Sequence, residues 1–356
     1  MAEGVANGMA NGQPALRLGV IGCGRIAQVA HLPAIAKEPT VQLVAVSDPS
    51  AALARAVAAR YEVPGYTDTA QLLREDLDAV LIAVPDRFHH GVGAQALEAG
   101  LHVLIEKPAA INSAEAIELT KLAAERGRKL QVGAMRRHDP ALRDAREAVA
   151  DIGPILSASF WYRLPSVLRA TTEAALFPPV VLDEAVRSTE AEHKADRETY
   201  LLRTHGAHVF DSVRYLLGDA TALHAALVRS GADLHWQGSI VTAATAAAAF
   251  SITANVHSEY AEGVEIFGAQ GHIRIRSYFP FYRRASSVRI FDERSLQWRG
   301  TDYGAVDPYQ RQLAAFATAI AQDGATDPCG ADGVAALQLI EATARSVANA
   351  GGRVTL

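Results

Sequence analysis

The chain has 356 residues, of which 49% are hydrophobic and 21% charged, and its formal net charge at neutral pH is −5. This length suits two domains, and the composition is that of an ordinary globular protein. The acidic balance excludes a broad basic face for nucleic acid, and the longest apolar runs are too short to cross a bilayer.

The chain begins with a segment, 1–14, that is rich in Gly, Ala and Asn. It has neither the basic stretch nor the apolar stretch of a signal peptide, so we predict a disordered tail. The two cysteines, Cys23 and Cys329, lie too far apart to indicate a disulfide framework or a zinc site. These features are typical of a protein of the reducing cytoplasm.

Strand and helix patterns alternate in the part from residue 15 to residue 138. Short apolar runs predict strands at Leu16–Ile21, Val41–Val46, Ala79–Val84, His102–Ile105 and Leu130–Val132. The segments between them predict helices at Ile26–Ala36, Ala51–Tyr61, Gly91–Ala99 and Ala114–Arg126. This alternation is typical of βαβ units. The expected fold class is α/β, with a doubly wound parallel sheet of the Rossmann type.

A second domain is expected from residue 139 to residue 356. Its predicted strands follow one another with only turns between them, at Ile155–Tyr162, Ala222–Ser230, Ser239–His257, Gly263–Ile275 and Ser287–Phe291. This succession is typical of an α+β domain with a large open, mostly antiparallel sheet. Two helices, Pro308–Gln322 and Asp332–Asn349, end the chain, and whether they pack back onto the first domain stays open.

One long polar stretch of the second domain, 164–200, has only weak periodicity. Long segments of this kind inside compact domains are often lids or binding loops. We therefore expect this stretch to help select the substrate.

The strongest local motif is Gly22-Cys23-Gly24-Arg25-Ile26-Ala27, which follows the first strand and opens a helix. In this G-x-G-x-x-A pattern the first glycine allows a tight turn and the second lets the backbone approach a pyrophosphate. The alanine allows close helix–strand packing. The free N–H groups of the helix start then hold the anion. The alternative is a structural glycine turn with a surface acid after the second strand, and the strand–turn–helix context favours the dinucleotide site.

That acid is Asp48, at the end of the second predicted strand, where a carboxylate can bind the ribose hydroxyls of an adenosine. A carboxylate there repels a 2′-phosphate, and the next residue is Pro49 rather than an arginine. The nearest cation that could favour the phosphate is Arg25. The expected cofactor is NAD, with NADP disfavoured, and Gly22, Gly24, Arg25, Ile26, Ala27 and Asp48 are the predicted binding residues.

Further motifs resemble those of one family, the glucose–fructose oxidoreductase, inositol dehydrogenase and rhizopine catabolism (Gfo/Idh/MocA) family. Gly100–Pro108 matches the family's G-x-H-V-x-x-E-K-P signature, and Asp78–His90 is similar to its fourth strand and the loop after it. The segments 263–273, 309–316 and 332–333 are also family-like. The resemblance covers nearly the whole chain and implies an NAD(P)-dependent oxidoreductase.

The resemblance implies roles for residues around Lys107. This lysine follows a strand end, where ligands bind in open α/β sheets, and in the family it contacts both substrate and nicotinamide. Its bond to Pro108 is commonly cis in relatives. Glu106 is carried over as a cofactor-side or lysine-orienting residue, and Pro85 and His89 as contacts of the nicotinamide half.

A second constellation resembles the family's D-x-G-x-H-x-x-D pattern at the start of a helix. By this resemblance His208 is the acid–base residue, and the ordinary pKa of histidine suits that work. Asp211 matches the last acid, but Thr204 stands where the family has its first acid. Thr204, His205 and Asp211 are predicted to bind substrate, although a buried structural role for His205 remains open.

Weaker candidates lie where the two domains meet. Arg136 and Arg137 resemble the family's basic pair, and Arg136 is predicted to bind substrate, with domain-joining salt bridges as the commoner role. Tyr162, at the end of a strand, is predicted to face the same pocket, although an aromatic residue there is more often part of the core. The scattered histidines lack the spacing of metal ligands, so no metal is expected.

These residues predict hydride transfer between nicotinamide and a secondary alcohol or ketone of a sugar, sugar derivative or cyclitol, with Lys107 and His208 as catalytic residues. Two alternatives stay open. The first is an enzyme of the same family that retains NAD and cleaves a glycoside or catalyses an elimination. The second is a non-catalytic dinucleotide-binding regulator, which the loss of the acid at position 204 would suit. The resemblance also implies a homodimer or homotetramer formed through the C-terminal sheet.

Overall fold

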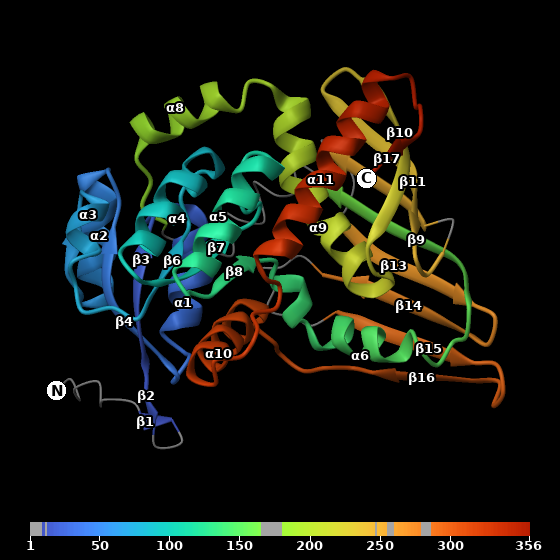
Figure 1. The fold of residues 1–356 in the computed structure, drawn as a ribbon, viewed down its shortest axis with the longest axis horizontal. Helices are drawn as coiled ribbons and strands as arrows, with labels where there is room; N and C mark the ends of the chain where they lie inside the picture. The colour runs from blue at the N-terminus through green and yellow to red at the C-terminus, as the bar shows by residue number, and fades with distance from the viewer. Residues whose placement is uncertain (1–8, 11–12, 165–179, 246–247, 255–259, 279–285) are drawn as a thin grey trace.

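The computed structural model describes residues 9–10, 13–164, 180–245, 248–254, 260–278 and 286–356. Within these residues the chain forms a parallel six-stranded sheet, then a nine-stranded sheet, and a two-stranded pair near the N-terminus. Figure 1 shows the parallel sheet with its helices on one side of the molecule and the large sheet on the other. The predicted fold class is confirmed.

The parallel sheet has the strand order β5-β4-β3-β6-β7-β8, and every neighbouring pair in it is parallel. The order reverses between β3 and β6, so the two halves of the sheet diverge there and leave the crevice in which such sheets bind ligands. The strands are β3 (Leu16–Ile21), β4 (Val41–Ser47), β5 (Gly65–Tyr66), β6 (Ala79–Ile82), β7 (His102–Glu106) and β8 (Leu130–Gly133).

Helices connect these strands, and polar side chains cap several of them. Ser50, Asp68 and Asn112 each accept a hydrogen bond from a backbone N–H in the first turn of the helix that follows. The predicted helix Ile26–Ala36 is π-helical over Ala27–His31 before it continues as α1. The helices are α1 (Leu32–Ile35), α2 (Ala51–Tyr61), α3 (Thr69–Leu72), α4 (His89–Glu98) and α5 (Ser113–Glu125).

The large sheet has the order β16-β15-β14-β13-β9-β12-β11-β10-β17, and only the pair β9–β12 is parallel among its described strands. Buried residues alternate along its strands, as expected for a sheet with one covered face. Its strands are β9 (Ile155–Leu164), β10 (Ala220–Ser230), β11 (Asp233–Thr242), β12 (Ala248–Ala254), β13 (Ala261–Gly268), β14 (Gly271–Ser277), β15 (Ser287–Asp292), β16 (Gln297–Thr301) and β17 (Val354–Thr355).

Two strand predictions were wrong because each joined two strands across a turn. The predicted strand Ser239–His257 is interrupted after Thr242, whose hydroxyl accepts hydrogen bonds from the backbone of Ala244 and Thr245; residues 255–257 lie outside the described residues. The predicted strand Gly263–Ile275 is the hairpin β13–β14. Alternation of apolar residues continues through such tight turns, so the pattern does not show them.

The polar stretch 164–200 contains helical structure that its weak periodicity did not predict. Residues 165–179 lie outside the described residues. Beyond them, Asp183 caps α8 (Glu184–His193) and Asp196 caps α9 (Arg197–Leu217). In the predicted tail, β1 (Met9–Ala10) pairs with β2 (Gln13–Pro14).

The remaining helices join the two sheets. α6 (Pro140–Ala148) contacts β14 and β15, and α11 (Gly330–Ala348) contacts α5, α9 and β10. α10 (Pro308–Ala321) places Leu313 and Phe316 in one buried cluster with Leu18 and Leu32 of the parallel domain. The last helices thus pack on both domains. No helix within the described ranges is long and apolar enough to cross a membrane.

Candidate active site

The glycine loop after β3 has the geometry that its motif requires. Gly22 has a φ of +98°, and a Cβ atom on it would lie 2.6 Å from the carbonyl oxygen of Ala83. A Cβ atom on Gly24 would meet nothing within 4 Å. Arg25 begins the helix with its side chain exposed, Ile26 is half-buried, and Ala27 is fully buried against the sheet. The loop therefore leaves open space beside Gly24, where a pyrophosphate would approach.

Asp48 closes the other side of this loop. Its side chain accepts hydrogen bonds from the backbone N–H of Cys23 and of Ser50, both at 2.8 Å. Burial is the main influence and raises the pKa of Asp48, although the two N–H donors act in the opposite direction. The carboxylate is thus held in one orientation at the end of β4.

These two features fit a dinucleotide. The open space at Gly24 suits the pyrophosphate, and the fixed carboxylate of Asp48 suits a ribose diol. Both lie at the carboxyl ends of neighbouring strands, β3 and β4, beside the point where the strand order reverses.

Lys107 follows β7 at the same edge of the sheet. Its bond to Pro108 is cis, and its Nζ atom donates to the carbonyl oxygen of Thr204 in α9 at 3.3 Å. Its backbone N–H donates to Glu106 Oε2 at 3.0 Å. The lysine therefore extends from the parallel domain to the helix that carries the second constellation.

Glu106 makes a second contact, which the sequence did not predict. Its Oε1 atom lies 2.7 Å from Nε2 of His31, a fully buried residue in the helix after the glycine loop. Burial alone would raise the pKa of Glu106, but the hydrogen bond to His31 and the nearby charges, including that of Lys107, together lower it. Glu106 thus stays ionised between the backbone of Lys107 and the imidazole.

His89 is buried beneath the edge of the parallel sheet where the strands have their carboxyl ends, here named the cofactor edge. It is not exposed at the surface of that edge. The side chain is 1% exposed, and its ring nitrogens lie 2.7 Å from the carbonyl oxygen of Pro108 and 2.9 Å from that of Val84. Burial lowers the pKa of His89, although its hydrogen bonds to the two carbonyl oxygens act in the opposite direction. This placement joins the loop after β6 to the loop after β7. Pro85, half-buried beside it, precedes the short helical turn Asp86–Phe88.

The second constellation lies in the middle of α9, not at a helix start as predicted. The segment 197–203 contains the good helix formers Arg, Glu and Leu, and it adds turns before Thr204. His205 and His208 both stack on Tyr162 of β9, with ring centroids 5.3 and 5.6 Å away. His205 is buried and His208 is half-buried. Lys107, Thr204, His208 and Tyr162 thus meet where the two domains join.

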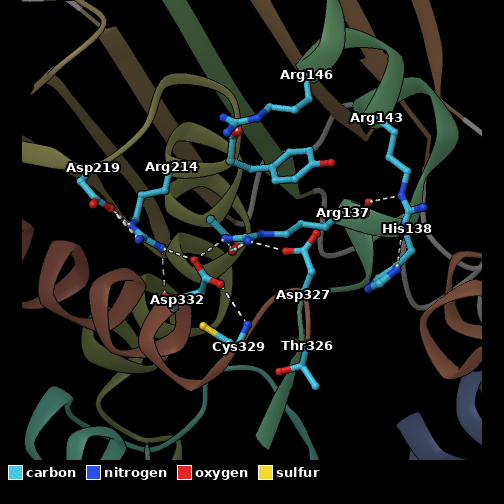
Figure 2. Close-up of polar contacts among 12 residues, drawn as sticks. Arg137, His138, Arg143, Arg146, Arg214, Asp219, Thr326, Asp327, Cys329 and Asp332 are labelled. Carbon is cyan, nitrogen blue, oxygen red and sulfur yellow. Dashed lines mark hydrogen bonds and ion pairs between the residues drawn. The ribbon is translucent and has the colours of Figure 1, made fainter. Parts of the chain in front are cut away.

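Asp211 and Arg137 form a buried ion pair. Arg137 donates to both carboxylate oxygens of Asp211 at 2.7–3.0 Å, and it also contacts Asp327 and Asp332. Figure 2 shows how Arg137 and Arg214 converge on Asp332. Burial would lower the pKa of Arg137, but these carboxylates raise it above its ordinary value. The structure therefore places Asp211 in a domain-joining network and not on an open substrate surface.

Arg136 is likewise committed to the second domain. Its guanidinium is almost fully buried and contacts the Glu262 carboxylate, the Tyr260 hydroxyl at 3.0 Å and the Tyr278 carbonyl oxygen at 2.8 Å. The commoner alternative for this basic pair, domain-joining ion pairs, describes both arginines. Among the described residues no group of three or more His, Cys, Asp and Glu side chains could hold a metal ion.

Several residues at the site had no local signal in the sequence. His31 lies 75 positions from Glu106, and Tyr260 and Glu262 lie more than a hundred positions from Arg136. These pairs form only when distant elements pack together. The signal available in the sequence was the charge of Glu106 and of Arg136, the member of each pair that a motif already contained.

Comparison with known proteins agrees with this geometry. Residues 16–134 match the model of the oxidoreductase family with an NAD-binding Rossmann fold, GFO_IDH_MocA. The chain is 31% identical to dTDP-3,4-didehydro-2,6-dideoxy-alpha-D-glucose 3-reductase of Streptomyces violaceoruber. The match extends over 318 residues and covers 87% of this chain and 86% of that protein. It is 29% identical over 345 residues to inositol 2-dehydrogenase of Rhizobium meliloti, which covers 94% of this chain and 97% of that protein.

The fold also matches solved structures. A levoglucosan dehydrogenase in complex with NADH and levoglucosan superposes with a TM-score of 0.78 at 21% identity, over 96% of this chain and 99% of that chain. The glycine loop, the E-K-P motif and these relatives together lead to one conclusion: the chain belongs to the Gfo/Idh/MocA family of NAD(P)-dependent oxidoreductases.

Proposed function

We propose that the protein is an NAD-dependent dehydrogenase or ketoreductase acting on a secondary alcohol or ketone of a sugar, sugar derivative or cyclitol. The contact between Lys107 Nζ and the Thr204 carbonyl oxygen carries the proposal, because it brings the E-K-P lysine within one helical turn of His208. The relatives named as an inositol dehydrogenase and a deoxysugar reductase support this substrate class.

Oxidation of a secondary alcohol removes a proton from oxygen and a hydride from carbon. The glycine loop and Asp48 would hold NAD, which would supply the hydride acceptor. His208 takes the hydroxyl proton, while the Lys107 ammonium donates to the same oxygen and fixes the carbon in position. Glu106 holds the backbone of Lys107, and Tyr162 packs flat against the ring of His208.

The residues around Lys107 and His208 differ from the family pattern at Thr204. A threonine cannot supply the negative charge of the usual acid, so the ammonium contacts a backbone carbonyl there. His205, Tyr162 and Thr204 remain candidates for substrate contact, since they surround His208. Arg136 and Asp211 hold the surrounding elements in place through their ion pairs with Glu262 and Arg137.

The proposal is tested with Lys107→Ala in an NADH absorbance assay over a panel of sugars and inositols. We expect turnover to fall by about 10²–10⁴-fold, because the group that binds the reacting oxygen is lost. NADH binding, measured by fluorescence titration, should stay within a few-fold of the wild-type value. Lys121→Ala, which changes an exposed lysine on α5, is the matched control. An unchanged rate in Lys107→Ala would overturn the assignment.

A second candidate is an enzyme that retains NAD while it cleaves a glycoside or catalyses an elimination. Four side-chain contacts between residues 180–203 and the cofactor edge favour it, because they would slow exchange of the dinucleotide. Product formation without net NADH release would support this reading. Stoichiometric NADH release with product would exclude it. Tight NADH binding with no turnover on any substrate would instead indicate a regulator.

A further inference from the structure

A carboxylate from the second domain lies beside the cofactor-binding edge. Asp183 Oδ2 accepts a hydrogen bond from the hydroxyl of Ser50 at 2.6 Å. Ser50 in turn donates its backbone N–H to Asp48 at 2.8 Å. The three residues form one connected group at the end of β4, although Asp183 is 133 positions from Ser50 in sequence.

The position of Asp183 is well determined by its surroundings. Just before it, the backbone of Val181 donates to and accepts from the side-chain amide of Gln28, at 3.0 and 2.9 Å. The other oxygen of Asp183 accepts from the backbone N–H groups of Ala185 and Val186, which begin α8. Asp183 is therefore held by Ser50 and by its own helix, and the chain two residues before it is held by the helix after the glycine loop.

This position bears on how a dinucleotide is recognised. A carboxylate at the position of Asp48 binds the adenosine ribose, so the 2′-oxygen lies next to it. A 2′-phosphate would bring about −1.5 to −2 charges to this place and would need donors there. Two donors next to Asp48, the backbone N–H and the hydroxyl of Ser50, are already engaged by Asp48 and Asp183.

Asp183 also adds charge. The two carboxylates are close enough that Asp183, together with burial as the larger cause, raises the pKa of Asp48. The hydrogen bond from Ser50 and the N–H groups of α8 lower the pKa of Asp183 itself. Asp183 is therefore ionised near neutral pH, and a phosphate would face two negative side chains.

We propose that Asp183 is a second determinant of cofactor specificity, which reaches the predicted ribose site from the second domain and excludes NADP by its charge and by its hold on Ser50. This inference rests on the proposed use of NAD through Asp48. It adds a residue that the glycine motif and the second strand do not contain.

The test compares dissociation constants of NADH and NADPH by fluorescence titration for the wild type, Asp183→Asn and Asp183→Ser. Asn and Ser both cap helices well, so α8 keeps its start. The ratio of the NADPH to the NADH constant should fall by about tenfold in both variants, because one like charge near the phosphate is removed. The constant for NADH should change little.

Glu192→Gln is the matched control, since it removes the same charge from an exposed position of α8. Its ratio should equal that of the wild type. The inference is overturned if both Asp183 variants keep the wild-type ratio, or if Glu192→Gln lowers it equally. Failure of the wild type to bind NADH would contradict the proposed function itself, so the two failures are distinguishable.

Discussion

Two adjacent arginines hold the domains together through different partners. Arg136 pairs with Glu262 of the large sheet, and Arg137 pairs with Asp211 of α9. Both side chains are nearly fully buried, where an unpaired charge is very costly. Each of the two arginines therefore needs its own acid. The second domain supplies one from β13 and one from α9.

Asp211→Asn should destabilise the protein by about 3 kcal/mol, because it leaves the Arg137 charge buried without its bidentate partner. Chemical denaturation measures this change, and the Michaelis constant should stay the same. Asp219→Asn is the control, since it removes an 80% exposed acid from Arg214 (Figure 2) and should leave stability almost unchanged. A raised Michaelis constant for the sugar or inositol substrate, with unaltered stability, would instead indicate that Asp211 contacts the substrate.

At the scale of elements, residues 180–203, here named the strap, cross the cofactor edge of the parallel sheet. Figure 1 shows α8 running above the first domain toward α9. The strap contacts the segments after β3, β4 and β6 in turn, through Gln28, Ser50, Asp86 and Arg87. These are the segments predicted to hold a dinucleotide, so we expect the strap to cover the path by which the cofactor would leave.

Glu190→Gln should weaken the strap, because Glu190 accepts two hydrogen bonds from Arg87 at 2.5 and 2.9 Å. We expect NADH to dissociate about tenfold faster, which corresponds to the loss of one charge-assisted pair of about 1.4 kcal/mol. Stopped-flow displacement of NADH measures the rate. Glu198→Gln breaks a comparable but more exposed pair with Arg229, away from this edge, and serves as the control. Equal release rates in all three proteins would rule out a covering role.

At the scale of the whole molecule, the large sheet has one face covered by helices and one face without cover from the described residues. The inner side chains of β9 and β12, such as Phe160 and Ile252, are buried against α9 and its neighbours. The outer face carries small side chains such as Ser159 and Ala249, together with larger ones such as Trp161 and Gln237, around an open hollow of about 620 Å³. A sheet face without helical cover of its own suits packing against a second sheet.

We expect the protein to run as a dimer or tetramer in size-exclusion chromatography with light scattering. Ala249→Glu should shift it toward the monomer, because a charge would be buried in the contact between sheets. Ala59→Glu, the same change at an exposed site of α2, should leave the assembly intact. A wild type with the mass of one chain would contradict this expectation.

Much of the fold was predictable because its signals are local. The apolar strands and the helices between them gave the parallel sheet, and the succession of strands after residue 139 gave the open sheet. The turns inside 239–257 and 263–275 were not predicted, since a tight turn need not interrupt apolar alternation. α8 was also missed, because its polar sequence lacks an apolar stripe, and the local capping by Asp183 was the signal left unused.

The sequence by itself determined the dinucleotide loop, the acid after the second strand and the E-K-P lysine, because each works through neighbours in the chain or through the end of its own strand. Only the tertiary structure decided which of the predicted polar residues contact one another. It paired Glu106 with His31, Arg137 with Asp211 and Ser50 with Asp183, across 75, 74 and 133 positions. A hydrogen bond or buried ion pair depends on separation in space, and local sequence patterns carry no record of that distance.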